Sequence, residues 1–134
     1  MKLILLEDDL QRIDRFKAIL GQNHQLVIAR TAWAFIERYP TASDQADLIC
    51  LDHDLFTDSP DEPDPGDGRD VAGYLATQTP LCPALIHSTN APAADSMMFT
   101  LRDAGWNVDR IAPIGADWIE EYWFPTMLSM VDSK

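Results

Sequence analysis

The sequence predicts an α/β fold, a doubly wound sheet of five parallel strands in the order 2-1-3-4-5. The first observation is that short apolar runs alternate with helical stretches along the whole chain. The second is that these runs are apolar throughout, as expected for parallel strands covered on both faces. The third is the length: 134 residues suit one domain spanning 1–134, and no linker or repeat divides it.

The five expected strands are Leu3–Leu6, Leu26–Ala29, Leu48–Leu51, Ala84–His87 and Asn107–Ile111. Helical stretches follow each run, so successive strands are expected to be parallel and joined by right-handed crossovers. The flavodoxin-like strand order places the first and third strands side by side at the switch point of the sheet. Residues that follow these two strands should therefore meet at its carboxyl edge.

Capping and stop signals mark the helices between the strands. The expected helices cover residues 10–20, 32–39, 68 or 69 to 78, and 91 to about 104, with a last helix from about residue 117. The residues suited to cap the first, second and fourth helices are Asp9, Thr31 and Asn90. Pro40 should stop the second helix. Asp117 and Glu120 are spaced as a capping box for the last helix, which Pro125 should kink or divide in two.

Two acidic clusters occupy the switch point of the predicted sheet. Glu7 and Asp8 follow the first strand, and Asp52 follows the third. Carboxylates that lie close together repel one another unless a cation joins them, and Mg²⁺ or Mn²⁺ accepts such oxygen ligands. The pattern therefore favours a divalent-metal pocket over the alternative, which is a solvated acidic edge.

Composition excludes several classes of function. A net charge of −12 without a cluster of Lys or Arg disfavours electrostatic binding of duplex nucleic acid or of an anionic membrane. No apolar stretch approaches membrane-spanning length, and the start of the chain is unlike a signal peptide, so we expect a cytoplasmic protein. Cys50 and Cys82 lack metal-ligand spacing and are interpreted as reduced core residues.

The motif order resembles that of response-regulator receiver domains over essentially the full length. The positions that carry the resemblance are the acidic pair Glu7 and Asp8, the phosphoacceptor position Asp52, Asp54, Gly68 and the hydroxyl residue Ser88. The resemblance implies that Asp54 completes the metal shell through its backbone carbonyl. Receivers also carry a lysine after the fifth strand, whereas this chain has no lysine between Lys17 and Lys134. Arg110 lies inside the strand run, where a surface or salt-bridge role is expected, so phosphorelay signalling is disfavoured.

Two histidine-containing segments point to a divergent branch. Leu51-Asp52-His53-Asp54-Leu55 and His87-Ser88-Thr89-Asn90 resemble the receiver-like family proposed to process cyclic phosphates. This resemblance implies a phosphoesterase that acts on a phosphate-bearing small molecule or an RNA end.

The chemistry of cyclic-phosphate opening can be assigned to these residues. It needs a base, an acid and a cation, and histidine titrates near neutral pH. Asp52, His53 and His87 are the catalytic candidates, and Ser88 and Asn90 are the candidates for phosphate contact. The alternatives are that the histidines only orient their neighbours, and that Ser88 and Asn90 only cap the next helix.

One geometric difficulty accompanies the enzymatic interpretation. Side chains alternate along a strand, so Asp52 and Ser88 are expected on one face, and His53 and His87 on the other. The histidines would reach the metal only if the chain leaves regular strand geometry at residues 52 and 53.

Two other functions are compatible with the sequence. The chain could be a receiver that is phosphorylated on Asp52, or a pseudo-receiver that binds a protein partner or a second copy of itself through its C-terminal helix face. Trp118, Trp123 and Phe124 are the candidates for that face. The acidic segment 55–67 is expected to be a solvated loop, with a lid over the pocket as the less favoured interpretation.

Overall fold

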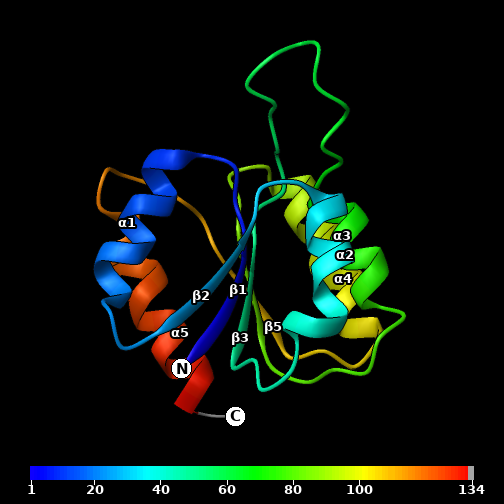
Figure 1. Cartoon of the computed structure of the whole chain (residues 1–134). Coiled ribbons are helices and arrows are strands. Elements are labelled where there is room, and N and C mark those ends of the chain that lie inside the picture. The colour runs from blue at the N-terminus through cyan, green and yellow to red at the C-terminus, as the bar shows by residue number, and fades with distance from the viewer. Residues whose placement is uncertain (133–134) are drawn as a thin grey trace.

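The five strands form one parallel sheet in the predicted order β2-β1-β3-β4-β5 (Figure 1). The strands are β1 (Lys2–Leu6), β2 (Gln25–Ala29), β3 (Leu48–Leu51), β4 (Ala84–His87) and β5 (Val108–Ile111). The computed structural model describes residues 1–132, so the last two residues of the predicted domain lie outside the described residues. The fold class predicted from the sequence is confirmed.

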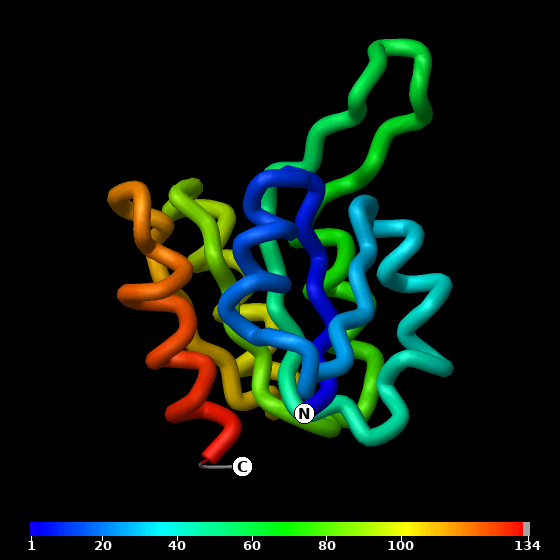
Figure 2. Tube along the Cα trace, turned by 60° about the vertical axis from the view of Figure 1, so that its left-hand side comes forward, coloured from blue at the N-terminus to red at the C-terminus, as the bar shows by residue number. Residues whose placement is uncertain are grey.

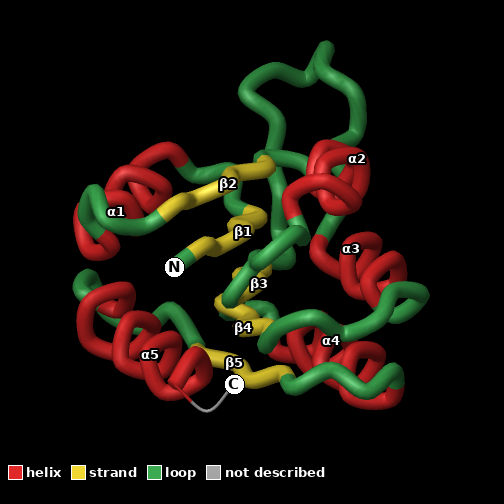
Figure 3. The backbone as a smooth tube through the Cα atoms, turned by 60° about the horizontal axis from the view of Figure 1, so that its bottom comes forward, coloured by secondary structure: helices red, strands yellow, loops and turns green. Residues whose placement is uncertain are grey.

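Helices cover both faces of this sheet (Figure 3). They are α1 (Leu10–Leu20), α2 (Ala32–Ala42), α3 (Gly68–Leu75), α4 (Ala91–Asp103), the π-helical turn η1 (Ile119–Trp123) and α5 (Phe124–Asp132). Helices α1 and α5 lie on one face, and α2, α3 and α4 lie on the other. None of the helices within residues 1–132 is long and apolar enough to cross a membrane.

Alternate strand residues feed two separate apolar layers. Leu5, Cys50 and Leu85 point toward α1 and α5, while their strand neighbours point toward α2, α3 and α4. Trp123 and Phe16 are fully buried in the first layer, and each such side chain contributes roughly 1.5–3 kcal/mol through removal of its apolar surface from water. Both layers end at the carboxyl edge of the sheet, where the strands give way to polar residues.

The caps predicted from the sequence are present. The Asp9 side chain accepts hydrogen bonds from the backbone N–H groups of Gln11 and Arg12, at 2.9 and 3.2 Å. Thr31 and Asn90 cap α2 and α4 in the same way. These caps satisfy N–H groups that have no partner within the helix, and they fix where α1 and α4 begin beside the carboxyl edge.

Two helix ends differ from the prediction. Helix α2 continues past Pro40 to Ala42, because a proline in the last turn removes one hydrogen bond without preventing the next, and Ser43 N–H donates to the Tyr39 carbonyl at 2.8 Å. Helix α3 ends at Leu75, three residues before the predicted end, and turns follow it.

The last helix is divided in two, as we predicted from Pro125, but the predicted capping box of Asp117 and Glu120 does not form. Glu120 pairs with Arg15 at 3.0 Å instead of folding back on Asp117. Pro125 is the second residue of α5, and the preceding η1 has a hydrogen bond from Phe124 N–H to the Ile119 carbonyl, five residues back. A tertiary ion pair has replaced a local capping interaction.

The two tryptophans considered for a partner surface lie in the core. Trp118 and Trp123 are buried between α1, α5 and the sheet. The exposed apolar side chains near the C-terminal helix are Ile114, Tyr122 and Leu128. The third candidate, Phe124, is half-buried against the same core. A protein partner or second copy on this face stays a prediction, with Phe124 and these exposed side chains available to it.

Candidate functional site

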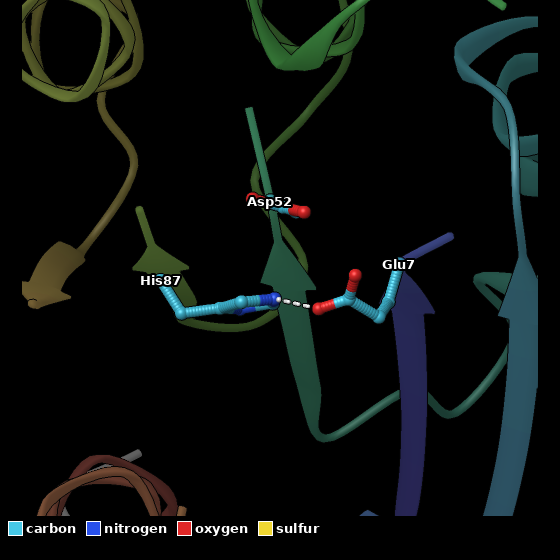
Figure 4. A group of neighbouring side chains, drawn as sticks. All are labelled: Glu7, Asp52 and His87. Atoms are coloured by element: carbon cyan, nitrogen blue, oxygen red, sulfur yellow. Dashed lines mark hydrogen bonds and ion pairs between the residues drawn. The ribbon is translucent and has the colours of Figure 1, made fainter. Parts of the chain in front are cut away.

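The register of the three central strands brings two acids and a histidine into one row. Leu51 on β3 is aligned with Leu6 on β1 and with Ile86 on β4. The next residues on the three strands therefore lie side by side, one position beyond the last pairs that join these three strands (Figure 4). They are Glu7, Asp52 and His87. One ligand atom from each lies within 4.8 Å of the others.

The expected grouping of side chains by face is wrong. We expected Asp52 to share a face with Ser88 and to lie opposite His87. Asp52 is aligned with His87 and not with Ser88. The side chains of Asp52 and His87 therefore lie on the same face, toward α1 and α5. The register between strands, which the local sequence does not contain, decides this pairing. No irregular strand end is needed to place a histidine beside Asp52.

Glu7 is fully buried and strongly held. Its Oε2 accepts hydrogen bonds from the N–H groups of Asp8 and Asp9, at 3.0 and 3.1 Å, and its Oε1 lies 3.0 Å from His87 Nε2. Burial alone raises the pKa of this carboxyl. The hydrogen bond and charge of His87, the Asp9 N–H and the Arg12 guanidinium outweigh burial and lower the Glu7 pKa to about 2. At neutral pH Glu7 is therefore a charged group beneath the acidic edge.

Asp52 experiences the opposite electrostatic effect. Burial, followed by the charge of Glu7, raises the Asp52 pKa to about 9, although the His53 N–H bonds its Oδ1 at 2.8 Å. Arg12 offsets only part of this repulsion, because its Nη1 lies 3.9 Å from Asp52 Oδ2. In the absence of a cation, Asp52 is therefore protonated at neutral pH.

A pocket of about 330 Å³ opens above this row. The residues that line it are Asp8, Asp9, Arg12, Asp52, Asp54, Phe56, Ser88 and Thr89. Asp8 Oδ2 accepts a hydrogen bond from Phe56 N–H at 2.7 Å, and burial raises the Asp8 pKa. Three of the predicted metal ligands, Asp8, Asp52 and Asp54, thus share one pocket, while the fourth, Glu7, lies beneath it.

The two candidate histidines lie in different places. His87 is fully buried, and its ring stacks on Trp118 with centroids 5.7 Å apart. His53 Nδ1 lies 2.6 Å from Asp54 Oδ1, and its Nε2 lies 3.6 Å from Asp67. Neither histidine lines the pocket, but each contacts an acid of the predicted metal set.

Ser88 and Asn90 hold the chain where β4 leads into α4. Asn90 N–H donates to Ser88 Oγ at 3.1 Å, and Asn90 Oδ1 accepts from Ala93 N–H at 3.2 Å. The capping role of Asn90 is therefore present, and phosphate contact by Ser88 and Asn90 stays a prediction. Arg110 donates to the Ser88 carbonyl at 3.0 Å and lies 3.9 Å from Asp95, in keeping with the expected salt-bridge role.

Sequence reasoning missed several residues of the pocket. Arg12 and Phe56 line it, and Arg30 holds its rim by donating to the Asp8 carbonyl at 2.9 Å. Arg12 lies in the first turn of the helix that Asp9 caps, beside the acidic edge, which is a local signal that could have found it. Arg30 and Phe56 come close only through the fold, so the sequence pattern around them gives no such signal.

The acidic loop stands away from the body of the molecule. Figures 1 and 2 show it extending beyond the carboxyl edge of the sheet instead of folding across it. Its base is fixed by Ala32 N–H, which donates to the Pro65 carbonyl at 2.8 Å, and by Trp33 Nε1, which donates to the Asp64 carbonyl at 3.0 Å. Phe56 is the residue of segment 55–67 that lines the pocket.

Several solved receiver domains share this fold. The non-phosphorylated HemR receiver domain from Leptospira biflexa matches with a TM-score of 0.70 and 23% identity, covering 99% of this chain and 94% of that chain. The BeF3-activated N-terminal receiver domain of Klebsiella pneumoniae RstA matches with a TM-score of 0.68 and 17% identity, covering 98% of both chains. The receiver domain of Francisella response regulator 1452 matches with a TM-score of 0.66 and 17% identity, covering 98% and 97%. These likenesses define the class: the chain has the receiver fold.

The family follows from a more specific match. A family model described as the cyclic-phosphate processing receiver domain matches residues 2–103. The chain belongs to this family, as the segments around His53 and His87 suggested. No curated protein matches the chain.

Proposed function

We propose that the protein is a metal-dependent phosphoesterase that opens cyclic phosphates or removes terminal phosphates of nucleotides or RNA ends. The observation that carries the proposal is the arrangement at the carboxyl edge. Asp8 and Asp52 share a pocket with the hydroxyl residues Ser88 and Thr89, while Glu7 and His87 lie directly beneath. Carboxylates and hydroxyls converge there at the switch point of the sheet, where ligands of this fold class bind.

The donor set fits Mg²⁺ or Mn²⁺. Asp8 and Asp52 offer carboxylate oxygens in the pocket, with Asp54 and Glu7 as the other predicted ligands. Burial, and after it the charge of Glu7, raises the pKa of Asp52, and a bound cation would offset both effects. When bound, such a cation would withdraw charge from phosphoryl oxygens and acidify a water molecule.

Opening a cyclic phosphate requires two proton movements. A water oxygen bonds to phosphorus and loses a proton to a base, while one ring P–O bond breaks and the released oxygen takes up a proton. His53 is the nearer proton carrier, because its partner Asp54 lines the pocket and their nitrogen and oxygen lie 2.6 Å apart. His87 lies beneath the pocket, where its Nε2 holds the Glu7 carboxylate at 3.0 Å and a ring nitrogen lies within 4.8 Å of a carboxylate oxygen of Asp52.

The test is ³¹P NMR of a 2′,3′-cyclic nucleotide incubated with the protein and Mg²⁺ or Mn²⁺. We expect ring opening by the wild type, and at least a tenfold loss of rate in His87→Ala and His53→Gln. His24→Gln is the matched control, since His24 precedes β2 at the opposite edge of the sheet. An unchanged spectrum with the wild type, or full activity in both His53→Gln and His87→Ala, would contradict the proposal.

A second candidate function is a receiver that accepts a phosphoryl group on Asp52. It is favoured by the receiver fold and by the placement of Asp52 and Asp8 in the same pocket. The position after β5 is Ala112, however, so the lysine of receivers has no counterpart there. A stable mass gain after treatment with acetyl phosphate, absent from Asp52→Asn, would support this alternative over hydrolysis.

A further inference from the structure

One side chain of the pocket carries a positive charge that no sequence motif assigned. Of the eight lining residues, four are aspartates and Arg12 is the single cation. Any phosphate that enters this pocket adds negative charge to an acidic wall. A divalent cation offsets part of that charge, and a second positive group that contacts the phosphate oxygens would offset the rest.

Arg12 has hydrogen-bond donors to spare. Its Nη1 lies 3.7 Å from Glu7 Oε1 and 3.9 Å from Asp52 Oδ2, and both distances exceed that of a hydrogen bond. Within residues 1–132, no hydrogen bond uses its guanidinium group. The side chain is 31% exposed, so it is held near the acids and still reaches solvent in the pocket.

An aromatic ring supports this guanidinium. The carbon at its centre lies 5.3 Å from the centroid of the Trp118 ring, a cation–π contact that leaves the N–H groups unused. Trp118 also stacks on His87, which bonds Glu7, so the arginine rests on the same buried layer as the acidic row. The group is therefore positioned before any ligand arrives.

Arg15 provides an internal comparison. It lies on the same helix, contacts the same Trp118 ring at 6.0 Å and is 33% exposed. Its guanidinium, however, is engaged by Glu120, with contacts of 3.0 to 3.4 Å to both carboxylate oxygens. Two arginines with similar surroundings thus differ in how they meet an acid: Arg15 hydrogen-bonds Glu120, whereas Arg12 makes only longer ion-pair contacts that leave its N–H groups unused.

We propose that Arg12 is the phosphate-binding cation of this pocket. Its planar guanidinium can donate two parallel hydrogen bonds to a pair of phosphoryl oxygens, which a lysine ammonium cannot do. The charge thus comes from α1, not from the end of β5, where Ala112 lines a separate cavity with Ile114 and Tyr122. This inference rests on the proposed function, since it concerns the same pocket, but it concerns phosphate binding and not turnover.

The experiment measures binding of inorganic phosphate to the Mn²⁺-loaded full chain by titration calorimetry. The variants are Arg12→Gln, Arg12→Lys and the control Arg15→Gln, with circular dichroism to verify folding. We expect Arg12→Gln to weaken phosphate binding about ten- to a hundredfold, the loss of charge-assisted hydrogen bonds. Its Mn²⁺ affinity should stay equal or increase, because a positive charge leaves the acidic pocket. The phosphate affinity of Arg12→Lys should lie between those of the wild type and Arg12→Gln, and the phosphate affinity of Arg15→Gln should match that of the wild type.

Two results would overturn the inference. One is phosphate binding by Arg12→Gln within twofold of the wild type, and the other is no phosphate binding by the Mn²⁺-loaded wild type. A parallel ³¹P NMR assay separates the two proposals. Phosphate binding that depends on Arg12, without turnover of a cyclic nucleotide, would refute the phosphoesterase and keep the inference. Turnover of the cyclic nucleotide by Arg12→Gln at the wild-type rate would refute the inference about Arg12 and keep the phosphoesterase.

Discussion

Replacement of Asp52 by asparagine should stabilise the metal-free protein at neutral pH. Asp52 has a pKa of about 9 in the folded chain, against 3.8 without its surroundings. Between these two values the folded state binds a proton that the unfolded state has lost, so stability decreases as the pH increases. Asparagine has nearly the same shape and carries no titrating proton, so it is free of this cost.

The size of the effect follows from the two pKa values. Each pH unit above the unfolded value costs about 1.4 kcal/mol, so at pH 7 the penalty reaches at most about 4 kcal/mol. The free energy of unfolding of Asp52→Asn should therefore exceed that of the wild type by an amount that grows by about 3 kcal/mol between pH 5 and pH 7. Near pH 4 the two proteins should be almost equally stable.

Urea unfolding of EDTA-treated protein, followed by tryptophan fluorescence, measures this difference. Trp118 and Trp123 are buried and report loss of the core. Addition of Mg²⁺ should stabilise the wild type more than Asp52→Asn, because the replacement removes one negative charge from the predicted set of metal ligands. A difference between the two proteins that stays constant from pH 5 to pH 7, or a less stable Asp52→Asn at pH 7, would refute the reasoning.

Three further predictions concern the surroundings of the pocket. Gly68→Ala should cost about 1–3 kcal/mol, because the new Cβ would overlap the backbone oxygen of Asp52. Gly73→Ala on the same helix meets nothing within 4 Å and should stabilise the protein by about 1 kcal/mol. Comparison of the two urea midpoints tests both values. Glu7 stabilises the fold above its unfolded pKa of 4.5 and loses this effect as the pH falls toward 2, so Glu7→Gln should flatten the pH dependence of thermal stability between pH 5 and pH 2. Asp9→Ala should cost about 1 kcal/mol of unfolding free energy by removing the α1 cap, and an unaltered urea midpoint would contradict this.

Local patterns in the sequence were sufficient for the elements and their order. Continuous apolar runs such as Leu48–Leu51 identified buried parallel strands, and single residues such as Asp9 and Asn90 identified helix starts. These signals depend on a few neighbouring residues, so they can be recognised without knowledge of the fold. The meeting of Glu7 and Asp52 also followed, because strand order alone brings the ends of β1 and β3 together.

What could not be predicted depends on contacts between distant segments. The alignment of Asp52 with His87 is a register between two strands, and a shift of one residue would have reversed it. Arg12 meets Trp118 only after the C-terminal segment packs on α1. Glu120 has the spacing of a capping residue but pairs with Arg15 across this same interface. In each case a tertiary interaction either outweighed the preference of the local sequence or depended on contacts that the local sequence does not specify.

Trp118 also bears on how the boundary of the domain is drawn. The family match ends at residue 103, and every residue that lines the pocket lies before that point. The indole that supports Arg12 and stacks on His87 lies beyond it. A chain cut at the limit of the match would retain the complete set of pocket residues and lose the surface on which two of its charged or titratable groups rest. The structural unit that supports this pocket therefore extends beyond the family match, and any transplant of the pocket into another protein must carry the C-terminal segment with it.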